Sequence, residues 1–233
     1  MRQLVSSSFT VCALMLAQPA IGQEEGPPVP VEKAAFHVPV FRNDQVALLN
    51  VYIPPGRAAG YHIHSSDQIS VLVQEADNAG QVLGEDPTPP RRNRRGSVTY
   101  TAYSNKPLTH RVTNTGPTPF NNIVIALLYP EPGRFTAGSR TDAAGYTLAI
   151  DNERVRIWRL VLEPGQSAGA ITQTAPGIRV VVDGGEIAES VPGQADRGMA
   201  PRLGEFYWQE PGAARTVRNT GTTRIEFVEI ELK

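Results

Sequence analysis

Two histidines separated by a single residue, His62 and His64, are the side chains of this sequence whose types and spacing best suit chemistry. Side chains alternate between the two faces of an extended strand, so both imidazoles of this HxH pair point to one side. A third histidine, His110, follows in the segment LTHRVTN and would come from a different strand. Gln68 adds a fourth candidate donor close to the pair.

Imidazole nitrogens are good ligands for divalent transition metals, and three of them leave open positions at which water or a substrate can bind. The alternative is that these are ordinary histidines of a β-domain. Burial of two neighbouring imidazoles without a partner would be costly, which favours the metal site. We therefore predict one divalent ion bound by His62, His64, Gln68 and His110. This donor set suits Fe, Mn, Ni, Zn or Cu.

The elements that would position these ligands are strands. The chain has 20 prolines, 21 glycines and many short runs of Val, Ile and Leu, a composition typical of strands joined by turns. We find no convincing amphipathic helix in the sequence, so the predicted fold class is all-β. Besides the HxH stretch, strands are predicted over residues 36–41, 46–53, 69–73, 97–103, 110–112 and 122–129.

The stretch 74–96 is polar and rich in proline and glycine, and we expect it to form a long loop. It carries the densest charge run of the sequence, Arg91-Arg92-Asn93-Arg94-Arg95. These arginines either close over an anion as a lid or form a solvated surface. We favour the solvated surface, because four acidic residues lie nearby in sequence: Glu75, Asp77, Glu85 and Asp86.

The second half of the chain repeats the first. The motifs that align are Asn-Asp-Gln-Val at 43–46 with Asn-Glu-Arg-Val at 152–155, Pro-Gly at 55–56 with 164–165, and Asn-Thr-Gly at 114–116 with 219–221. A period of roughly one hundred residues indicates two duplicated domains rather than a solenoid. A turn-rich connector precedes residue 146.

The repeat shows which residues replace the candidate ligands in the second copy. The aligned pairs are His62 with Ile171, His64 with Gln173, Gln68 with Gly177 and His110 with Arg215. The shared β-framework therefore does not itself require the histidines. We expect the metal in the first copy alone, while the second copy is structural or carries a different site.

The pattern of Gly56, the HxH pair, Gln68 and then His110 with Asn114 resembles the two motifs of the cupin superfamily. Because both copies share the framework, the chain resembles a two-domain member, a bicupin. The resemblance implies two tandem jelly-roll β-barrels, a metal-binding one over residues 36–132 and a degenerate one over 146–233, packed together as a pseudo-dimer. It also implies metal ligation by the HxH pair, a glutamate and the later histidine.

Two positions depart from the cupin pattern: Gln68 stands where cupins have the glutamate, and Glu75 stands where the first motif usually has glycine. In cupin enzymes that glutamate often serves as ligand and as acid or base, whereas a neutral amide coordinates through oxygen but cannot carry a proton. Asp67 either takes over proton transfer or is an ordinary turn residue, which we favour. His37 has no ligand-like neighbour in sequence and is expected at the surface or at a strand end.

The resemblance leaves three classes of function open. We favour a metal-dependent, dioxygenase-like oxidoreductase acting on a small organic molecule, because a three-histidine site is open. A metal-dependent isomerase or lyase would instead use the ion to polarise a carbonyl or enediol. A noncatalytic, exported small-molecule-binding cupin is favoured by the absent glutamate and the second copy without ligands. Association of the chain into a homo-oligomer stays open.

The N-terminus has the features of an export signal. Residues 1–22 are predicted to be a signal peptide, with Arg2 before a short apolar stretch and small residues before Gln23. No run reaches the ~20 apolar residues that span a membrane, and we expect an exported protein, periplasmic or secreted. Cys12 lies inside this segment, so the mature chain would form no disulfide. Residues 23–35 are predicted to be a mobile, proline-rich linker. The formal net charge of the chain is −1, which argues against a nucleic-acid partner.

Overall fold

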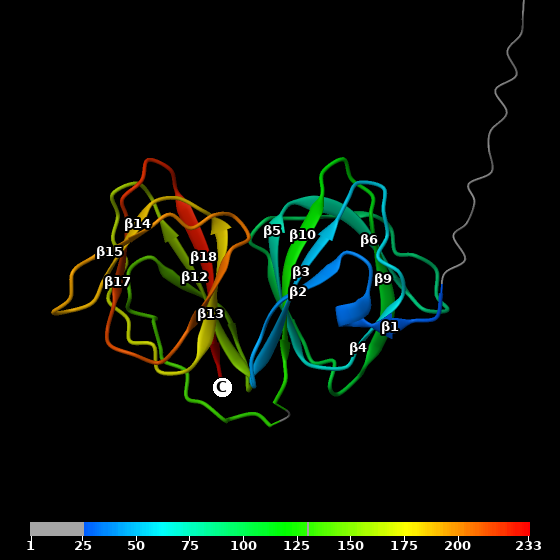
Figure 1. The fold of residues 1–233 in the computed structure, drawn as a ribbon, viewed down its shortest axis with the longest axis horizontal. Coiled ribbons are helices and arrows are strands. Elements are labelled where there is room, and N and C mark those ends of the chain that lie inside the picture. Colours follow the sequence, from blue (N-terminus) through cyan, green and yellow to red (C-terminus); the bar gives the residue numbers. More distant parts are fainter. Residues whose placement is uncertain (1–25, 130) are drawn as a thin grey trace, which may run out of the picture.

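The computed structural model describes residues 26–129 and 131–233, and within them the chain forms two β-barrels that lie side by side (Figure 1). The predicted signal peptide, Cys12 and the first three residues of the predicted linker lie outside the described residues. Apart from one 3-10 turn, η1 (Val31–Lys33), the regular elements of the described part are strands. The prediction of an all-β fold made of two tandem barrels is confirmed.

The N-terminal barrel consists of two five-stranded sheets. The first, in the order β2-β3-β10-β5-β8, contains β2 (His37–Arg42), β3 (Val46–Ile53), β10 (Phe120–Leu127), β5 (Gln68–Gln74) and β8 (Val98–Thr101). The second, in the order β1-β4-β9-β6-β7, contains β1 (Val29–Pro30), β4 (His62–His64), β9 (Leu108–Asn114), β6 (Ala76–Val82) and β7 (Arg91–Asn93). The three candidate histidines therefore lie on adjacent strands of the second sheet, and Gln68 begins a strand of the first.

The C-terminal barrel follows the same plan with a smaller second sheet. Its five-stranded sheet, in the order β11-β12-β18-β13-β16, contains β11 (Tyr146–Asp151), β12 (Val155–Leu162), β18 (Ile225–Leu232), β13 (Gly177–Asp183) and β16 (Phe206–Gln209). Its three-stranded sheet contains β15 (Arg197–Met199), β14 (Ile187–Ser190) and β17 (Thr216–Asn219). Matching registers support the internal repeat, since Val46 pairs with Leu127 in the first barrel and Val155 with Leu232 in the second.

The stretch 74–96, predicted to be one long loop, contains strands β6 and β7, so that prediction is wrong. β6 pairs with β9, and β7 pairs with β6 to form the edge of the sheet. The sequence of β6, ADNAGQV, has little intrinsic preference for a strand, and its backbone is held in the sheet by pairing with β9. Nε of Arg92 lies 2.5 Å from Glu75, in agreement with a charge-balanced surface.

The first barrel begins before residue 36, inside the stretch predicted to be a linker. β1 pairs in parallel with β4, with Val29 opposite His62, and Val31 packs against the buried core of the barrel. Proline is tolerated in a strand at a sheet edge because no partner needs its missing donor. Part of the predicted linker is therefore the edge strand beside the HxH pair and not a mobile connection.

The two barrels share a buried apolar cluster, as expected for a pseudo-dimer. The cluster is built from the two large sheets, and its members include Leu48, Ile69 and Ile125 of the first barrel with Ile157, Val180 and Ile230 of the second. Strand β18 alternates between two cores: Val228 belongs to the shared cluster, and Phe227 belongs to the interior of its own barrel. Burial on both faces explains why all eight residues of β18 are buried.

A buried polar contact also crosses between the barrels. Asp67 accepts hydrogen bonds from Oη of Tyr100 at 2.7 Å and from the amide and hydroxyl of Ser104 at 3.0 and 2.5 Å. Its Oδ2 lies 3.4 Å from Nη1 of Arg154 in the second barrel. Burial acts to raise the pKa of Asp67, but the hydrogen bonds from Ser104 and Tyr100 and the charge of Arg154 together lower it.

Replacing Asp67 with alanine should lower the free energy of unfolding by about 3 kcal/mol, because one member of a buried ion pair would be left uncompensated. Urea-induced unfolding at neutral pH measures this difference. The pKa of Asp67 is lower in the folded than in the unfolded state. Asp67 therefore stabilises the folded protein at pH values above its unfolded-state pKa, and this stabilisation is lost as the pH falls through its folded-state pKa. The exposed Asp44 gives the control: Asp44→Ala should change stability by less than about 0.5 kcal/mol, and an equal loss in both variants would contradict the prediction.

Candidate metal centre

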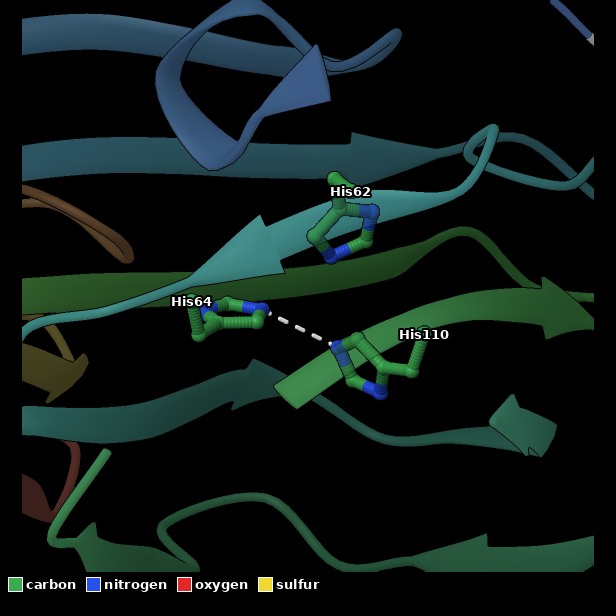
Figure 2. Close-up of side chains that lie close together, drawn as sticks. All are labelled: His62, His64 and His110. Atoms are coloured by element: carbon green, nitrogen blue, oxygen red, sulfur yellow. Dashed lines mark hydrogen bonds between the residues drawn. The ribbon is translucent and has the colours of Figure 1, made fainter. Parts of the chain in front are cut away.

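Three histidines from two neighbouring strands converge inside the N-terminal barrel. His62 and His64 project from β4 and His110 projects from β9, which pairs with β4 so that His62 lies opposite His110 (Figure 2). One ring nitrogen of each residue lies within 4.8 Å of the other two. His62 and His64 are only 1% and 4% exposed. The fold thus brings together the three side chains that the sequence pattern singles out.

Hydrogen bonds fix which nitrogen of the paired histidines can bind a metal. Nδ1 of His62 donates to the carbonyl oxygen of Gly60 at 2.8 Å, and Nδ1 of His64 donates to Oε1 of Gln68 at 2.7 Å. A carbonyl or amide oxygen can only accept, so Nδ1 carries the proton and Nε2 keeps its lone pair. In metal sites, a hydrogen-bond acceptor on the ring nitrogen that does not bind the metal, here called an outer partner, orients the imidazole ligand.

The spacing of the free nitrogens fits a single ion. Nε2 of His64 lies 3.0 Å from Nε2 of His110. Two imidazoles bound at about 2.0–2.1 Å, with an angle of about 90–110° at the metal, would have their nitrogens about 2.8–3.4 Å apart. The donor types, the tautomers of His62 and His64 and the spacing between His64 and His110 therefore fit a divalent ion held by three imidazoles.

Burial keeps these imidazoles neutral. Burial, together with the charges of the neighbouring histidines, lowers the pKa of His64 to about 3 and that of His110 to about 4. Burial also lowers the pKa of His62, against the opposing effect of the hydrogen bond to Gly60. Because a metal binds the neutral ring, all three side chains are in the ligand form at neutral pH.

Gln68 lies on the Nδ1 side of His64, behind the nitrogen that would face an ion. Its Oε1 accepts the hydrogen bond from His64, and its Nε2 donates to Oγ of Ser70 at 3.1 Å. In this geometry the amide holds the His64 ring in place and acts through that ring. Direct coordination by Gln68 would require this hydrogen bond to be exchanged for the ion, and it stays a prediction.

Asp67 has no free carboxylate oxygen to offer as an acid or base. Both oxygens are engaged, Oδ1 by Ser104 and Oδ2 by Tyr100 and Arg154. The structure therefore supports the interpretation of Asp67 as a structural turn residue.

The remaining histidine of the chain joins the cluster, and its expected surface position is wrong. His37 is the first residue of β2, which agrees with the expected position at a strand end. It is only 9% exposed, however, and its ring centroid lies 4.6 Å from that of His62. Burial lowers the pKa of His37 to about 4, against a hydrogen bond to Ala35 that raises it. The sequence contains no spacing that links His37 to the HxH pair. The one available signal is that the chain has only four histidines.

Two cavities adjoin the histidines. The first, of about 280 Å³, is lined by His110, by the exposed Arg91 and by uncharged polar side chains that include Ser70, Asn78, Thr99 and Asn122. The second, of about 410 Å³, is lined by His64 and Gln68 together with Leu49. Oδ1 of Asn122 is buried without a hydrogen-bond partner among the described residues, so it can accept a hydrogen bond from a bound molecule.

The second barrel lacks the histidine cluster at the equivalent point. Ile171 lies opposite Arg215 in a bridge, as His62 lies opposite His110, which confirms that the aligned residues occupy equivalent places. Across residues 26–129 and 131–233, no second group of histidine, cysteine or carboxylate side chains has ligand atoms gathered closely enough to hold a metal.

Charged side chains fill that point instead. Oε1 of Gln173 accepts hydrogen bonds from Arg140 and Arg215, each at 3.0 Å. Arg140 also forms an ion pair with the fully buried Glu229. Burial acts to raise the pKa of Glu229, but Arg179 and Arg140 hold it at about 2. The second barrel therefore has an internal ion network where the first has neutral imidazoles.

Replacing Gln68 with leucine should weaken metal binding by about 10–100-fold, because the loss of an outer partner of a histidine ligand typically has this effect. Gln68→Glu should bind metal at least as tightly as the parent, since a carboxylate accepts more strongly from Nδ1 of His64 and adds negative charge. Competition with a chromophoric chelator measures both. Ser70→Ala, which removes only the contact at the far end of Gln68, is the control. Equal affinities in all variants would show that Gln68 merely fills the turn.

The metal-free protein should lose stability as the pH is lowered from about 6.5 to about 4. Histidine has a pKa near 6.5 in an unfolded chain, whereas folding lowers the pKa of His64 to about 3 and of His110 and His37 to about 4. Between these values the unfolded chain binds more protons, so the free energy of unfolding rises with pH. Denaturant unfolding at several pH values measures the slope. The double variant His62→Ile, His64→Gln should have a shallower slope, and an unchanged slope would contradict this origin.

The fold is shared with solved structures, although no protein-family model and no curated protein matches the sequence. A cupin 2 conserved barrel domain protein from Leptotrichia buccalis is 9% identical, with a TM-score of 0.50 over 84% of this chain and 88% of that one. Oxalate decarboxylase from Bacillus subtilis is 12% identical, with a TM-score of 0.54 over 81% of this chain and 68% of that one.

Salicylate 1,2-dioxygenase from Pseudaminobacter salicylatoxidans is 14% identical to this chain, with a TM-score of 0.53 over 81% of this chain and 71% of that one. Similarities at such low identity establish a shared fold and not a shared activity. The chain therefore has the cupin fold in its two-domain form, two tandem jelly-roll β-barrels, with its candidate metal centre in the first.

Proposed function

We propose that this protein is a metal-dependent oxidoreductase of the dioxygenase type that acts on a small organic molecule. The observation that carries the proposal is the convergence of three neutral imidazoles, two buried and one half-buried, beside a polar cavity. Three such ligands can hold one divalent ion, for which Fe, Mn, Ni, Zn and Cu are candidates, and they leave positions open for a substrate. The fold shared with salicylate 1,2-dioxygenase supports this choice by analogy alone.

The chain's own residues would bind and orient the substrate. When bound, Fe, Mn, Ni or Cu would supply a Lewis acid and a redox centre, whereas Zn would supply a Lewis acid alone. Asn122 has a free amide oxygen for a substrate hydroxyl, and Ser70 and Thr99 add hydroxyls to the same cavity wall. Because the three histidine ligands are neutral, the positive charge of the ion is not offset by them. We therefore propose an anionic substrate that chelates through two oxygens.

A metal-dependent isomerase or lyase is the second candidate, and the fold shared with oxalate decarboxylase is the observation in its favour. Such reactions commonly need a positioned acid or base. The carboxylate of Asp67 is engaged by other residues, and none of the described residues that line the 280 Å³ cavity carries a carboxylate, whereas Glu32 lines the 410 Å³ cavity beside His64. This chemistry favours a reaction in which the protein need not exchange a proton with the substrate.

A noncatalytic binding protein is the third candidate, supported by the amide of Gln68 at the glutamate position and by the ion network of the second barrel. We also propose that the protein acts after export, in the periplasm or outside the cell, on the basis of residues 1–22 of the sequence. In the part of the chain that the structure describes, no helix has the length and apolar character needed to cross a membrane.

Purified protein should contain one divalent ion per chain by elemental analysis. After loading with Fe(II) it should consume dioxygen in the presence of salicylate or another aromatic hydroxy acid. The variant His62→Ile, His64→Gln should hold no ion and consume oxygen at the background rate while staying folded, because the second barrel has these residues at the equivalent positions.

Three results would contradict this proposal in distinguishable ways. Turnover of the substrate without oxygen consumption would favour the isomerase or lyase. An ion with ligand binding but no turnover over a broad panel of hydroxy acids would favour the binding protein. A parent protein that holds no transition metal under any loading condition would overturn the metal centre itself.

A further inference from the structure

His37 is a buried fourth histidine that the three-imidazole site does not use. Its ring lies against the ring of His62, with centroids 4.6 Å apart and planes inclined at 56°. Its charge would also be felt by His64 and His110, whose pKa values it helps to lower. All four histidines of a 233-residue chain are thus gathered in one place.

The backbone before His37 adopts an unfavourable conformation that turns the chain into β2. Among the described residues, Phe36 is the only non-glycine residue with a positive φ, at 66°. A bulky residue seldom adopts this region, and it persists only where surrounding contacts impose it. Two backbone hydrogen bonds do so here, from the amide of Tyr52 to Phe36 at 2.9 Å and from the amide of His37 to Ala34 at 3.2 Å.

The hydrogen bonding of His37 is the same as that of the ligand beside it. Nδ1 of His37 donates to the carbonyl oxygen of Ala35 at 2.9 Å, and Nδ1 of His62 donates to that of Gly60 at 2.8 Å. In both cases the acceptor lies two residues earlier in the chain. The proton is therefore on Nδ1 and the lone pair is on Nε2, which has no hydrogen-bond partner within the described ranges. A lone pair on a residue that is only 9% exposed is suited to a cation.

We propose that His37 is the fourth protein ligand of the metal centre. The proposal rests on the metal site proposed above. His37 contacts the ring of His62 but does not belong to the group of three histidines whose nitrogens lie within 4.8 Å of one another. Its Nε2 must therefore move toward the ion when the ion binds. Four neutral imidazoles leave the full charge of the ion in place and favour Zn, Cu, Fe or Ni over Mg or Ca.

The test counts imidazole ligands directly in the parent protein and in His37→Phe, which keeps an aromatic ring against His62. Both proteins are loaded with Cu(II) and studied by pulsed electron paramagnetic resonance, and their Zn(II) affinities are measured by chelator competition. We expect four imidazoles in the parent, three in the variant, and a Zn(II) affinity lower by about 100-fold or more, beyond the range typical of an outer partner.

The control variant is Tyr103→Phe. The Tyr103 ring stacks on His64 at 4.7 Å, so it also contacts a ligand, but it has no nitrogen to donate. This variant should keep four imidazoles and the parent affinity. A thermal melt of each protein shows whether it is folded, and the count in the parent does not depend on any variant.

Several outcomes would overturn the assignment. Three imidazoles in the parent would exclude His37 as a ligand. A weaker affinity in His37→Phe with the same count in both proteins would make His37 a positioning residue, which also contradicts the proposal. A parent protein that binds neither Cu(II) nor Zn(II) would instead refute the underlying metal site, and this result is distinct from the other two.

Discussion

The pairing of β4 with β9 is the constraint on which the candidate metal centre depends. It sets His62 opposite His110, so that residues far apart in the chain share one face of a sheet. β4 has only three residues and cannot be held by its own contacts alone. β1 pairs with its other edge, and β6 pairs with the far edge of β9, where Val82 lies opposite His110. Both flanking strands, β1 and β6, come from stretches with weak strand signals, yet they complete the sheet that holds the ligands.

A buried asparagine makes the same hydrogen bonds in the turn after the equivalent strand of each barrel, which explains why the Asn-Thr-Gly turn is repeated. The side chain of Asn114 donates to two backbone carbonyls and accepts from the amide of Gly116. Asn219 makes the equivalent bonds and accepts from the amide of Gly221. Both amides are satisfied internally, so the turn after β9 or β17 is fixed whichever side chains fill the barrel.

The two barrels handle polar interiors in different ways, and this difference decides which one can take a metal. Buried charges require partners of opposite sign, and in the second barrel Arg140 and Arg179 are paired with Glu229. An imidazole instead becomes neutral on burial, because its pKa falls, and it keeps a lone pair to donate. The first barrel can therefore accept a cation from solution, whereas the second already contains its own cations.

The sequence by itself determined the all-β fold, the duplication and the convergence of His62, His64 and His110, because strand alternation and an internal repeat are local patterns. The places of Gln68 and His37 were decided by the tertiary structure alone. Gln68 turns to Nδ1 of His64, and a positive φ at Phe36 directs the chain so that His37 is buried against His62. Strand β6 likewise exists because β9 pairs with it. Contacts between residues distant in sequence set all three, and no local pattern encodes them.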